Sequence, residues 1–477
     1  MSTLPRRPKQ YDRSIIEGPI PRAVWRLAWP TMLQNIIGGL QGIIDHILVG
    51  HFVGIAGIAA IGDSWQVYLV VIVFVSSLYT GMAVLVARFV GSGDAGKVNR
   101  SVYQAFLATT AISFLVLAPL GYFIAPFLLD FVNAEADVSA QALPFLRIMF
   151  VSSFGMMTYF MVGGALRAAG DSRTPLRLGI VMTTLNIILN VILIRGLGPI
   201  PALGTAGSAL GTAIASCAVA MYAVHKFRSG DWVVEFERGS SLRPDWAIIK
   251  SLFRFGLPAG MQGVAMNIAG IMLLRFIGSL ELSKEAQSAF TIGYTQLFSL
   301  ITWTSFGLMG AASAVAGQNL GAGHPERSAR AVHAASMMGI VLAATMGIFF
   351  LTIPRELLNV FGMANDPAAV AMGVQLLGVL SVSGLFVTVA LTYTGGLQGT
   401  GDTRSPFLIS VVSQMIIPIG MLEVLQLTRG LRATDIWTAI LIGHMTRCLL
   451  SVLRFRQQKW RHIKVDIEPQ KTVTRGS

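Results

Sequence analysis

The chain has 477 residues, of which 53% are hydrophobic and only 12% are charged. Soluble proteins carry roughly 25% charged residues, so the composition disfavours a soluble enzyme, a disordered chain and a secreted disulfide scaffold. The two cysteines, Cys217 and Cys448, lie in apolar runs, which excludes a disulfide framework and a four-cysteine zinc site. The net charge of +13 favours nucleic acid as a partner only if membrane topology does not explain it.

The first 21 residues are basic and lack the apolar core of a signal peptide, so they are predicted to form an N-terminal tail. Twelve apolar stretches follow, and each is long enough to cross a bilayer. The sequence therefore predicts an all-α integral membrane protein with twelve transmembrane helices. These lie at about 22–50, 54–87, 101–129, 140–166, 174–194, 200–225, 247–278, 286–318, 329–353, 368–397, 405–428 and 434–453.

The lysines and arginines are distributed unevenly between alternate gaps. One side of the predicted membrane holds 27 of the 36, the other side holds five, and the rest lie within helices. The positive-inside rule places the richer side, with both termini, in the cytoplasm. We therefore expect a multi-pass protein of the plasma (inner) membrane whose partners include the lipid bilayer and exclude nucleic acid.

Motifs in the first half of the chain recur in the second half. GSGDAGKVNR at 91–100 matches GAGHPERSAR at 321–330, and GGALRAAGDSRTP at 163–175 matches GGLQGTGDTRSP at 395–406. Pro30 and Pro258 also occupy corresponding positions. These matches predict two six-helix lobes related by a pseudo-twofold axis along the membrane normal, an arrangement found in transporters. The predicted parts are an N-lobe at 22–225, a cytoplasmic linker at 226–246, a C-lobe at 247–455 and a cytoplasmic tail at 456–477.

Asp45 is the clearest ionisable group deep inside a predicted helix. Gln34, Gly38, Gln41 and Asp45 fall on one helical face, so this polar stripe is expected to face protein or water. An intramembrane acid usually marks a functional site, where it can exchange H⁺ or Na⁺. A carboxylate that only hydrogen-bonds its neighbours is the alternative. The stripe is flanked by Asn35, Gly42 and His46.

Asn186 and Asn190 lie four residues apart and share a polar helix face with Thr183. Amide oxygens can coordinate Na⁺ and amide groups can hydrogen-bond an acid, although interhelical packing is an equal alternative. In the 247–278 stretch, Gln262 and Asn267 are further candidates for lining a polar cavity.

The remaining polar groups do not indicate an enzyme. The sequence contains no nucleophile–base constellation, no metal-ligand spacing of histidines and no phosphate-binding loop, so no cofactor is expected. Glu423 lies near the outer end of its predicted helix and is interpreted as interfacial. His444 is interpreted as a packed or hydrogen-bonded core residue.

Five stretches of the chain form a specific set in this order: LAWPTMLQNIIGGLQGIIDHILVG at 27–50, AAIG at 59–62, GSGD at 91–94, LRAAGDSRTP at 166–175 and NIILN at 186–190. Together they resemble the MATE family, multidrug and toxic compound extrusion, over about 22–455. The resemblance implies two six-helix lobes that form a V around a central cavity. It also implies export of organic, often cationic, compounds in exchange for Na⁺ or H⁺.

The resemblance also implies roles for individual residues. Asp45 matches the acid that couples transport to the ion, Asn186 and Thr212 match polar residues that accompany it, and Pro30 matches a proline at which the first helix bends. Asn190 departs from the family pattern, because many relatives carry Asp there. The loss of that carboxylate weakens the case for tight Na⁺ binding.

These features lead to one hypothesis and one main alternative. The hypothesis is a monomeric antiporter that exports a small organic substrate, coupled through Asp45 to H⁺ in preference to Na⁺. The only metal considered is Na⁺ at Asp45. The alternative is a flippase for a lipid-linked precursor or polysaccharide from the same superfamily.

Overall fold

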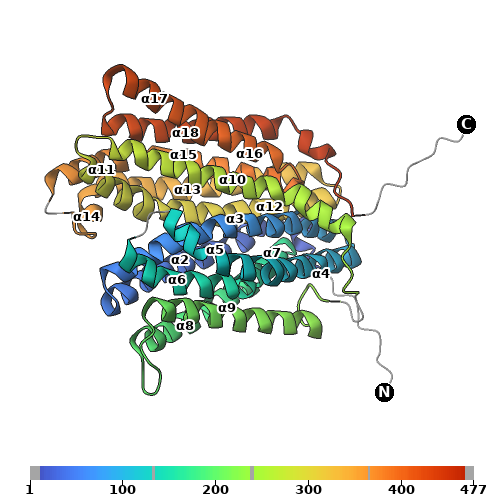
Figure 1. The fold of residues 1–477 in the computed structure, drawn as a ribbon. Coiled ribbons are helices and arrows are strands. Elements are labelled where there is room, and N and C mark those ends of the chain that lie inside the picture. Colours follow the sequence, from blue (N-terminus) through green and yellow to red (C-terminus); the bar gives the residue numbers. More distant parts are fainter. Residues whose placement is uncertain (1–10, 132–134, 237–240, 364–365, 468–477) are drawn as a thin grey trace, which may run out of the picture.

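The computed structural model describes residues 11–131, 135–236, 241–363 and 366–467 (Figure 1). Within these residues the chain is helical throughout, and its helices run side by side in one bundle. The two ends of the described chain lie at the same end of the bundle (Figure 1). This end is called the terminal end below.

The first half of the chain forms a short helix and six spanning units. These are α1 (Ser14–Glu17), α2 (Ile20–Phe52), α3 (Ile55–Ser92), α4–η1–α5 (Ala95–Ala111, Ile112–Leu117, Ala118–Phe131), α6–α7 (Ala136–Val151, Ser153–Ala168), α8 (Arg173–Arg195) and α9 (Gly204–Ser229).

The second half repeats this order. Its elements are α10 (Trp246–Gly278), α11–η2–α12 (Ser283–Phe290, Thr291–Leu297, Ser299–Gly321), α13 (Pro325–Thr352), α14 (Pro354–Asn359), α15 (Pro367–Thr400), α16–η4–α17 (Arg404–Ser410, Val411–Ile416, Ile417–Arg429), α18 (Ala433–Arg456) and η5 (Lys459–His462). The segments η1, η2 and η4 are π-helical turns within longer helices.

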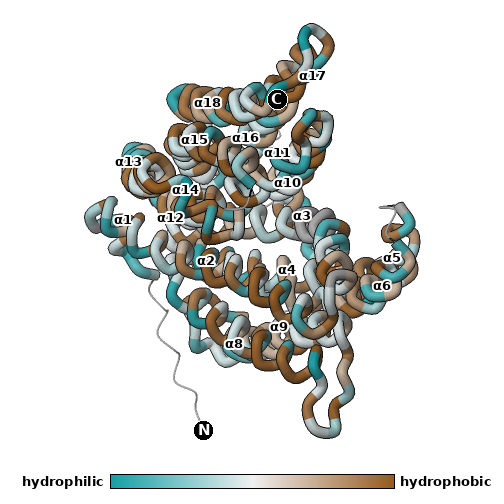
Figure 2. Tube along the Cα trace, turned by 90° about the vertical axis from the view of Figure 1, so that its left-hand side faces the viewer, coloured by the Kyte–Doolittle hydropathy of each residue, from teal (hydrophilic) through white to brown (hydrophobic). Residues whose placement is uncertain are grey.

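The predicted all-α, multi-pass fold is confirmed. Among the described residues, ten helical units are long and apolar enough to cross a membrane, and the bent pair α6–α7 is an eleventh. Helix α3, with 38 residues, completes the set. Hydrophobic residues dominate these helices, as the view along the bundle shows (Figure 2).

Two predicted helices differ from the observed ones. The stretch 140–166 is broken at Ser152, where α6 and α7 meet at 53°. The Ser152 hydroxyl donates to the backbone oxygen of Ile148 over 2.6 Å, a bond that competes with the helical ladder and bends helices. The helix expected from 101 begins at Ala95, because the Asp94 side chain accepts a hydrogen bond from the backbone nitrogen of Lys97 and caps it.

The first six units lie on one side of the bundle and the last six on the other (Figure 1). The two lobes meet through repeat-related glycines near the terminal end. A Cβ on Gly91 would collide with the backbone oxygen of Gln318, and one on Gly321 would collide with that of Arg88. The two contacts are related by the repeat. Gly91 and Gly321 are 230 positions apart, and so are Arg88 and Gln318. The helices α3 and α12 therefore meet symmetrically.

A second glycine pair brings α3 against α10. A Cβ on Gly81 would collide with the backbone oxygen of Leu252, and one on Gly256 with that of Ser77. Two backbones can approach this closely only where both contact residues lack a side chain. The terminal end is consequently the end at which the lobes are closed against each other.

The segment after α18 crosses this closed end from the C-lobe to the N-lobe. Trp460 is only 1% exposed. Further along, Arg88 of α3 donates to the backbone oxygen of Ile463 over 3.2 Å, and Lys97 of α4 lies 3.4 Å from Asp466. The predicted C-terminal tail is therefore packed onto the bundle as far as residue 467.

The segment before α2 makes the reciprocal crossing. Ile15 in α1 is fully buried among residues of α12. Asn319 donates to the backbone oxygen of Ile15 over 3.3 Å, and Arg327 donates to that of Gly18 over 2.7 Å. Each lobe therefore carries a terminal segment that packs against the other lobe.

Candidate functional site

Asp45 lies in a buried polar cluster formed by α2, α8 and α9. Asp45 is only 7% exposed, and its Oδ1 accepts a 2.7 Å hydrogen bond from Nδ2 of Asn190. Asn190 and Asn186 are fully buried behind it, one helical turn apart on α8. The Asn186 amide donates to the hydroxyl of Thr212 on α9 over 3.0 Å. The structure thus brings together all four predicted coupling residues.

The polar stripe of α2 continues this network. Nε2 of Gln41 donates to the Asn186 side-chain oxygen over 3.1 Å, and Oε1 of Gln41 accepts from the Thr183 hydroxyl over 2.7 Å. If the Asn186 amide is turned over, its nitrogen reaches Asp45 Oδ1 at 3.3 Å. In either orientation, uncharged amides surround the carboxylate.

Gly211 makes room for the amide that holds Asp45. A Cβ at this position would collide with Oδ1 of Asn190. That oxygen is buried and has no hydrogen-bond partner among the described residues. Asn190 can therefore satisfy Asp45 only because α9 has no side chain at position 211.

A cavity of about 400 Å³ opens beside Asp45. It is lined by Gln34, Asn35, Gln41 and Thr212, together with aromatic residues from both lobes. Of the described residues that line this cavity, Asp45 alone is charged. The carboxylate consequently borders on open space on one side and on the Asn186–Asn190 pair on the other. This space is called the Asp45 cavity below.

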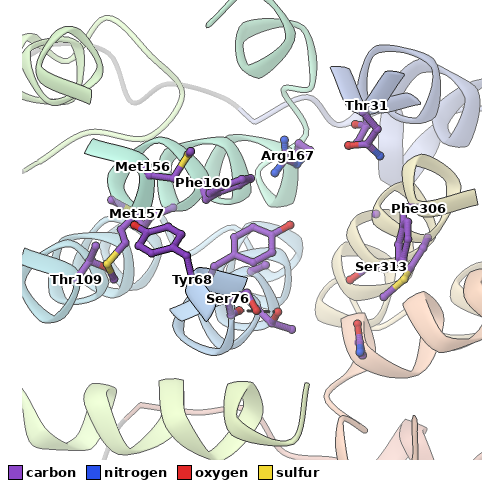
Figure 3. Close-up of a pocket in the computed structure, with 18 of the residues that line it drawn as sticks. Thr31, Tyr68, Ser76, Thr109, Met156, Met157, Phe160, Arg167, Phe306 and Ser313 are labelled. Carbon is purple, nitrogen blue, oxygen red and sulfur yellow. Dashed lines mark hydrogen bonds between the residues drawn. The ribbon is translucent and has the colours of Figure 1, made fainter. Parts of the chain in front are cut away.

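A second cavity, of about 340 Å³, lies between the lobes (Figure 3). Helices α2, α3, α4, η1 and α7 of the N-lobe contribute to it, as do α12 and α15 of the C-lobe. Its wall is largely apolar, and it shares four lining residues with the Asp45 cavity: Asn35, Met156, Phe160 and Phe306. This central cavity and the Asp45 cavity are therefore adjacent.

Among the described residues that line the central cavity, Arg167 is the only charged one. It donates to Oε1 of Gln34 over 3.0 Å, and Nε2 of Gln34 donates to the Tyr159 hydroxyl over 2.8 Å. Its guanidinium also lies 6.0 Å from the centre of the Tyr79 ring. The helix predicted at 140–166 stops just before Arg167, but α7 extends to Ala168, and Arg167 turns towards the cavity (Figure 3).

The remaining predicted polar residues lie apart from this cluster. Asn267 is exposed and His46 is half-buried, and each interacts with a carbonyl of its own helix. Gln262 donates to Ser410 over 2.9 Å and accepts from Gln398, a residue of the central cavity, over 3.2 Å. It therefore belongs to a separate network in the C-lobe.

Asn35 and Pro30 occupy the part of α2 that contacts the C-lobe. The Asn35 amide donates to the backbone oxygen of Trp303 in α12 over 3.1 Å. Pro30 is buried within α2, where its ring removes one backbone hydrogen bond. One turn of α2 thus combines a weakened ladder with a contact between the lobes.

The site offers few ligands to a metal ion. Among the described residues, no group of three or more histidine, cysteine, aspartate or glutamate side chains could hold one. The oxygen atoms near Asp45 come from asparagine, glutamine and threonine side chains.

This bundle of two repeated six-helix lobes around cavities with a buried acid defines a membrane transporter fold. The MatE family model matches residues 30–192 and 258–421, which are the same parts of the two repeats. The chain therefore belongs to the MATE family of multidrug efflux transporters and is not an enzyme.

Individual relatives agree with this assignment. The chain is 25% identical over 449 residues to a probable multidrug resistance protein NorM of Thermotoga maritima, covering 92% of this chain and 93% of that protein. It is 23% identical over 442 residues to the multidrug resistance protein MdtK of Pectobacterium atrosepticum, covering 91% and 95%.

Solved structures show the same fold. A multidrug resistance MATE family transporter of the MOP superfamily in an outward-facing conformation superposes with a TM-score of 0.87 at 20% identity, covering 95% of this chain and 98% of that one. A MOP superfamily transporter from Pyrococcus furiosus, described as having reversed polarity in its binding pocket, gives a TM-score of 0.86 at 20% identity, with the same coverage.

Proposed function

We propose that this protein is a proton-coupled antiporter that exports small organic compounds, with Asp45 as the group that takes up and releases the proton. The observation that carries the proposal is the position of Asp45, a buried acid that borders a cavity on one side and an amide network on the other. A membrane-buried acid without a role in transport would be selected against, because it is expensive to insert.

The geometry around Asp45 supports exchange of its proton. The ionised form is stabilised by the Asn190 hydrogen bond, since a bond to a charged acceptor contributes about 1.5–3 kcal/mol. The protonated form is neutral and suits the low-polarity surroundings. Because the Asp45 cavity adjoins the central cavity, a change of charge at Asp45 alters the environment in which an organic substrate is held.

The central cavity supports an organic substrate. Four methionines and four aromatic residues line it, and methionine side chains can adapt to different apolar shapes. Its one guanidinium is held against the wall by Gln34. The names of the NorM and MdtK relatives suggest that the transported compounds are drugs.

Proton coupling is favoured over Na⁺ coupling by the number of carboxylates. Asp45 is the only acid in the polar cluster of the described chain, and Asn190 replaces a second carboxylate with a neutral amide. A metal ion would find one charged ligand group here and otherwise only neutral oxygens, whereas a proton needs only the carboxylate. At 100 mV, one proton entering the cell supplies ~2.3 kcal/mol.

The orientation follows from the distribution of basic residues. We place the terminal end in the cytoplasm of a cell enclosed by a plasma (inner) membrane, with the protein acting as a monomer. In that orientation the glycine contacts at the terminal end close the cytoplasmic side. The α2 segment around Pro30 would then rearrange during the transition between outward- and inward-facing states.

The experiment is efflux of ethidium, a fluorescent organic cation, from proteoliposomes under either an imposed pH gradient or a Na⁺ gradient. Wild type should respond to the pH gradient, and Asp45→Asn should abolish the response. Glu423→Gln, which neutralises an exposed acid on α17, is the matched control and should retain it. Undiminished pH-driven efflux by Asp45→Asn would show the coupling assignment to be wrong.

The alternative substrate is a lipid-linked precursor or polysaccharide. Such molecules carry phosphates, and a cavity that binds them needs several free cations. The central cavity presents only Arg167, which is already engaged by Gln34. This observation favours an organic compound over a polyanionic lipid.

A further inference from the structure

Arg447 is a buried charge in the C-lobe that the proposed function does not use. It lies in α18, and the residue is 2% exposed. Within the described part of the chain it makes no hydrogen bond, ion pair or ring contact, and its Nε is buried without an acceptor. Its electrostatic neighbours are Tyr294 and His444, neither of which supplies a negative charge.

His444, three residues before Arg447 on α18, is itself held by neighbouring side chains. His444 interacts with the Ser383 hydroxyl through Nδ1 at 3.2 Å. Its ring stacks on Tyr294 and Phe298 with centroids 6.4 Å and 5.9 Å apart. These contacts hold His444 and Tyr294, and neither side chain carries a negative charge that could pair with the guanidinium.

Two hydroxyls without partners belong to α18, the helix that carries Arg447, and to the η4 segment packed against α18. Gly443, Arg447 and Ser451 follow one another at intervals of one helical turn. Gly443 faces the π-helical segment η4, since a Cβ there would lie 2.9 Å from the backbone oxygen of Ser413. The hydroxyls of Ser413 and Ser451 are both buried and have no hydrogen-bond partner among the described residues.

A guanidinium and hydroxyls that lack acceptors are the donor set that a small anion requires. Arginine cannot lose its proton in a protein, and a buried charge that is neither paired nor hydrogen-bonded is strongly unfavourable. Since the described chain supplies no acid to Arg447, the compensating charge has to come from a bound species. Interruptions of the α-helix by π-turns, such as η4, recur at functional sites.

The repeat shows that this cation is specific to one lobe. The two cysteines, 217 and 448, are 231 residues apart, so Arg447 corresponds to Ser216 in the N-lobe. In the other direction, Asp45 corresponds to Leu273 by the spacing of the two helix prolines. At these positions the N-lobe therefore carries an acid and the C-lobe an arginine, and neither has a charged counterpart at the corresponding position of the other lobe.

We propose that the C-lobe binds a small monovalent anion, a halide such as chloride, against the guanidinium of Arg447, with the hydroxyls of Ser413 and Ser451 as additional donors. The anion neutralises the interior of the C-lobe and links α18 to η4. A halide is the class of anion we choose because Arg447 is enclosed, with only 2% of the residue exposed, and halides are small. This site is separate from Asp45 and does not depend on the proposed antiport.

The test compares thermal unfolding of the purified protein in sodium chloride, sodium bromide and sodium gluconate at one ionic strength. Wild type should unfold at a higher temperature in both halides, with a saturable dependence on their concentration. Arg447→Gln should lose this dependence. Arg275→Gln removes an exposed arginine of α10 instead and should keep it. Equal unfolding temperatures of wild type in chloride and gluconate would overturn the proposal.

A second measurement does not require a variant that folds. Crystals of the wild-type protein grown with bromide should show an anomalous bromine peak within hydrogen-bonding distance of the Arg447 guanidinium. Arg447→Lys keeps the charge but loses the planar donor fork, so it should bind bromide about tenfold more weakly. A bromide-equilibrated crystal without a peak at Arg447 would contradict the site.

Discussion

The side-chain amide of Asn190 donates a 2.7 Å hydrogen bond to the carboxylate of Asp45, so an uncharged neighbour holds the acid of the candidate site. The other oxygen-bearing side chains nearby are also neutral. This pairing allows the acid to change its charge without a change in any second ionisable group. The pairing also suggests that the chemistry of the site depends on what stands at position 190.

Asn190→Asp should convert the site into one that binds Na⁺. Two adjacent carboxylates repel each other unless a cation or a proton lies between them. The variant should therefore be stabilised by Na⁺, by about 1.4 kcal/mol at a concentration ten times the dissociation constant. The measurement is thermal unfolding in NaCl against choline chloride. Asn190→Ala, which adds no charge, should unfold at the same temperature in both salts. Equal unfolding temperatures for Asn190→Asp would contradict the expectation.

Some parts of this site could be predicted from spacing alone, and others could not. The stripe of Gln34, Gln41 and Asp45 follows from helical periodicity within α2, and the structure places all three on the Asp45 cavity. The contact between Asp45 and Asn190 joins residues 145 positions apart. No local pattern encodes such a contact, and only the family resemblance suggested it.

The placement of two arginines inside the bundle could not be predicted from where they stand in the sequence. Arg167 lies in the last turn of α7 beside a run of loop cations, where an outward orientation is the ordinary expectation. Arg447 could equally have paired or extended to the interface, because burial depends on neighbouring helices. The packing of the two terminal segments against the opposite lobe was also missed, since Ile15 and Trp460 lie in short, mostly polar stretches that form no periodic apolar pattern.

Asp12 should make the stability of the folded protein depend slightly on pH. Burial raises the pKa of its carboxyl, but hydrogen bonds from Ser14 and the charge of Arg26 lower it more, so the net pKa lies below the ordinary value. A lowered pKa stabilises the folded state above about pH 3.9, the ordinary value, and this contribution disappears as the pH falls through the folded-state pKa.

The matching variant is Asp12→Asn. At pH 7 it should be less stable than wild type by less than about 1 kcal/mol, because the pair with Arg26 is partly exposed. The difference should shrink as the pH is lowered below about 4. Thermal unfolding at a series of pH values measures it, and a difference that grew towards low pH would have the wrong sign.

Trp460→Ala should release the C-terminal segment from the closed end of the bundle. Loss of a fully buried tryptophan costs about 3–5 kcal/mol. The loss should be largely local, because residues 459–467 follow the last spanning helix. Limited trypsin digestion should then cut faster after Arg461 and Lys464. Trp246→Ala, at a position 74% exposed, is the control and should leave the cleavage rate unchanged. Equal rates in both variants would show that Trp460 does not anchor the segment.

Gly211→Ala should disable Asp45 without altering any polar residue. The added methyl group would collide with the side-chain oxygen of Asn190, and the only relief is to move that amide away from the carboxylate. Efflux of ethidium driven by a pH gradient should fall at least tenfold, and overpacking should lower stability by about 1–3 kcal/mol.

The control for this variant is Gly270→Ala, which adds the same methyl group to α10 where nothing lies within 4 Å. Alanine is a better helix former than glycine by about 1 kcal/mol, so this change should be neutral or slightly stabilising and should retain efflux. If Gly211→Ala retained full efflux while it lost stability, the Asn190–Asp45 hydrogen bond would be a packing contact and not part of the coupling site.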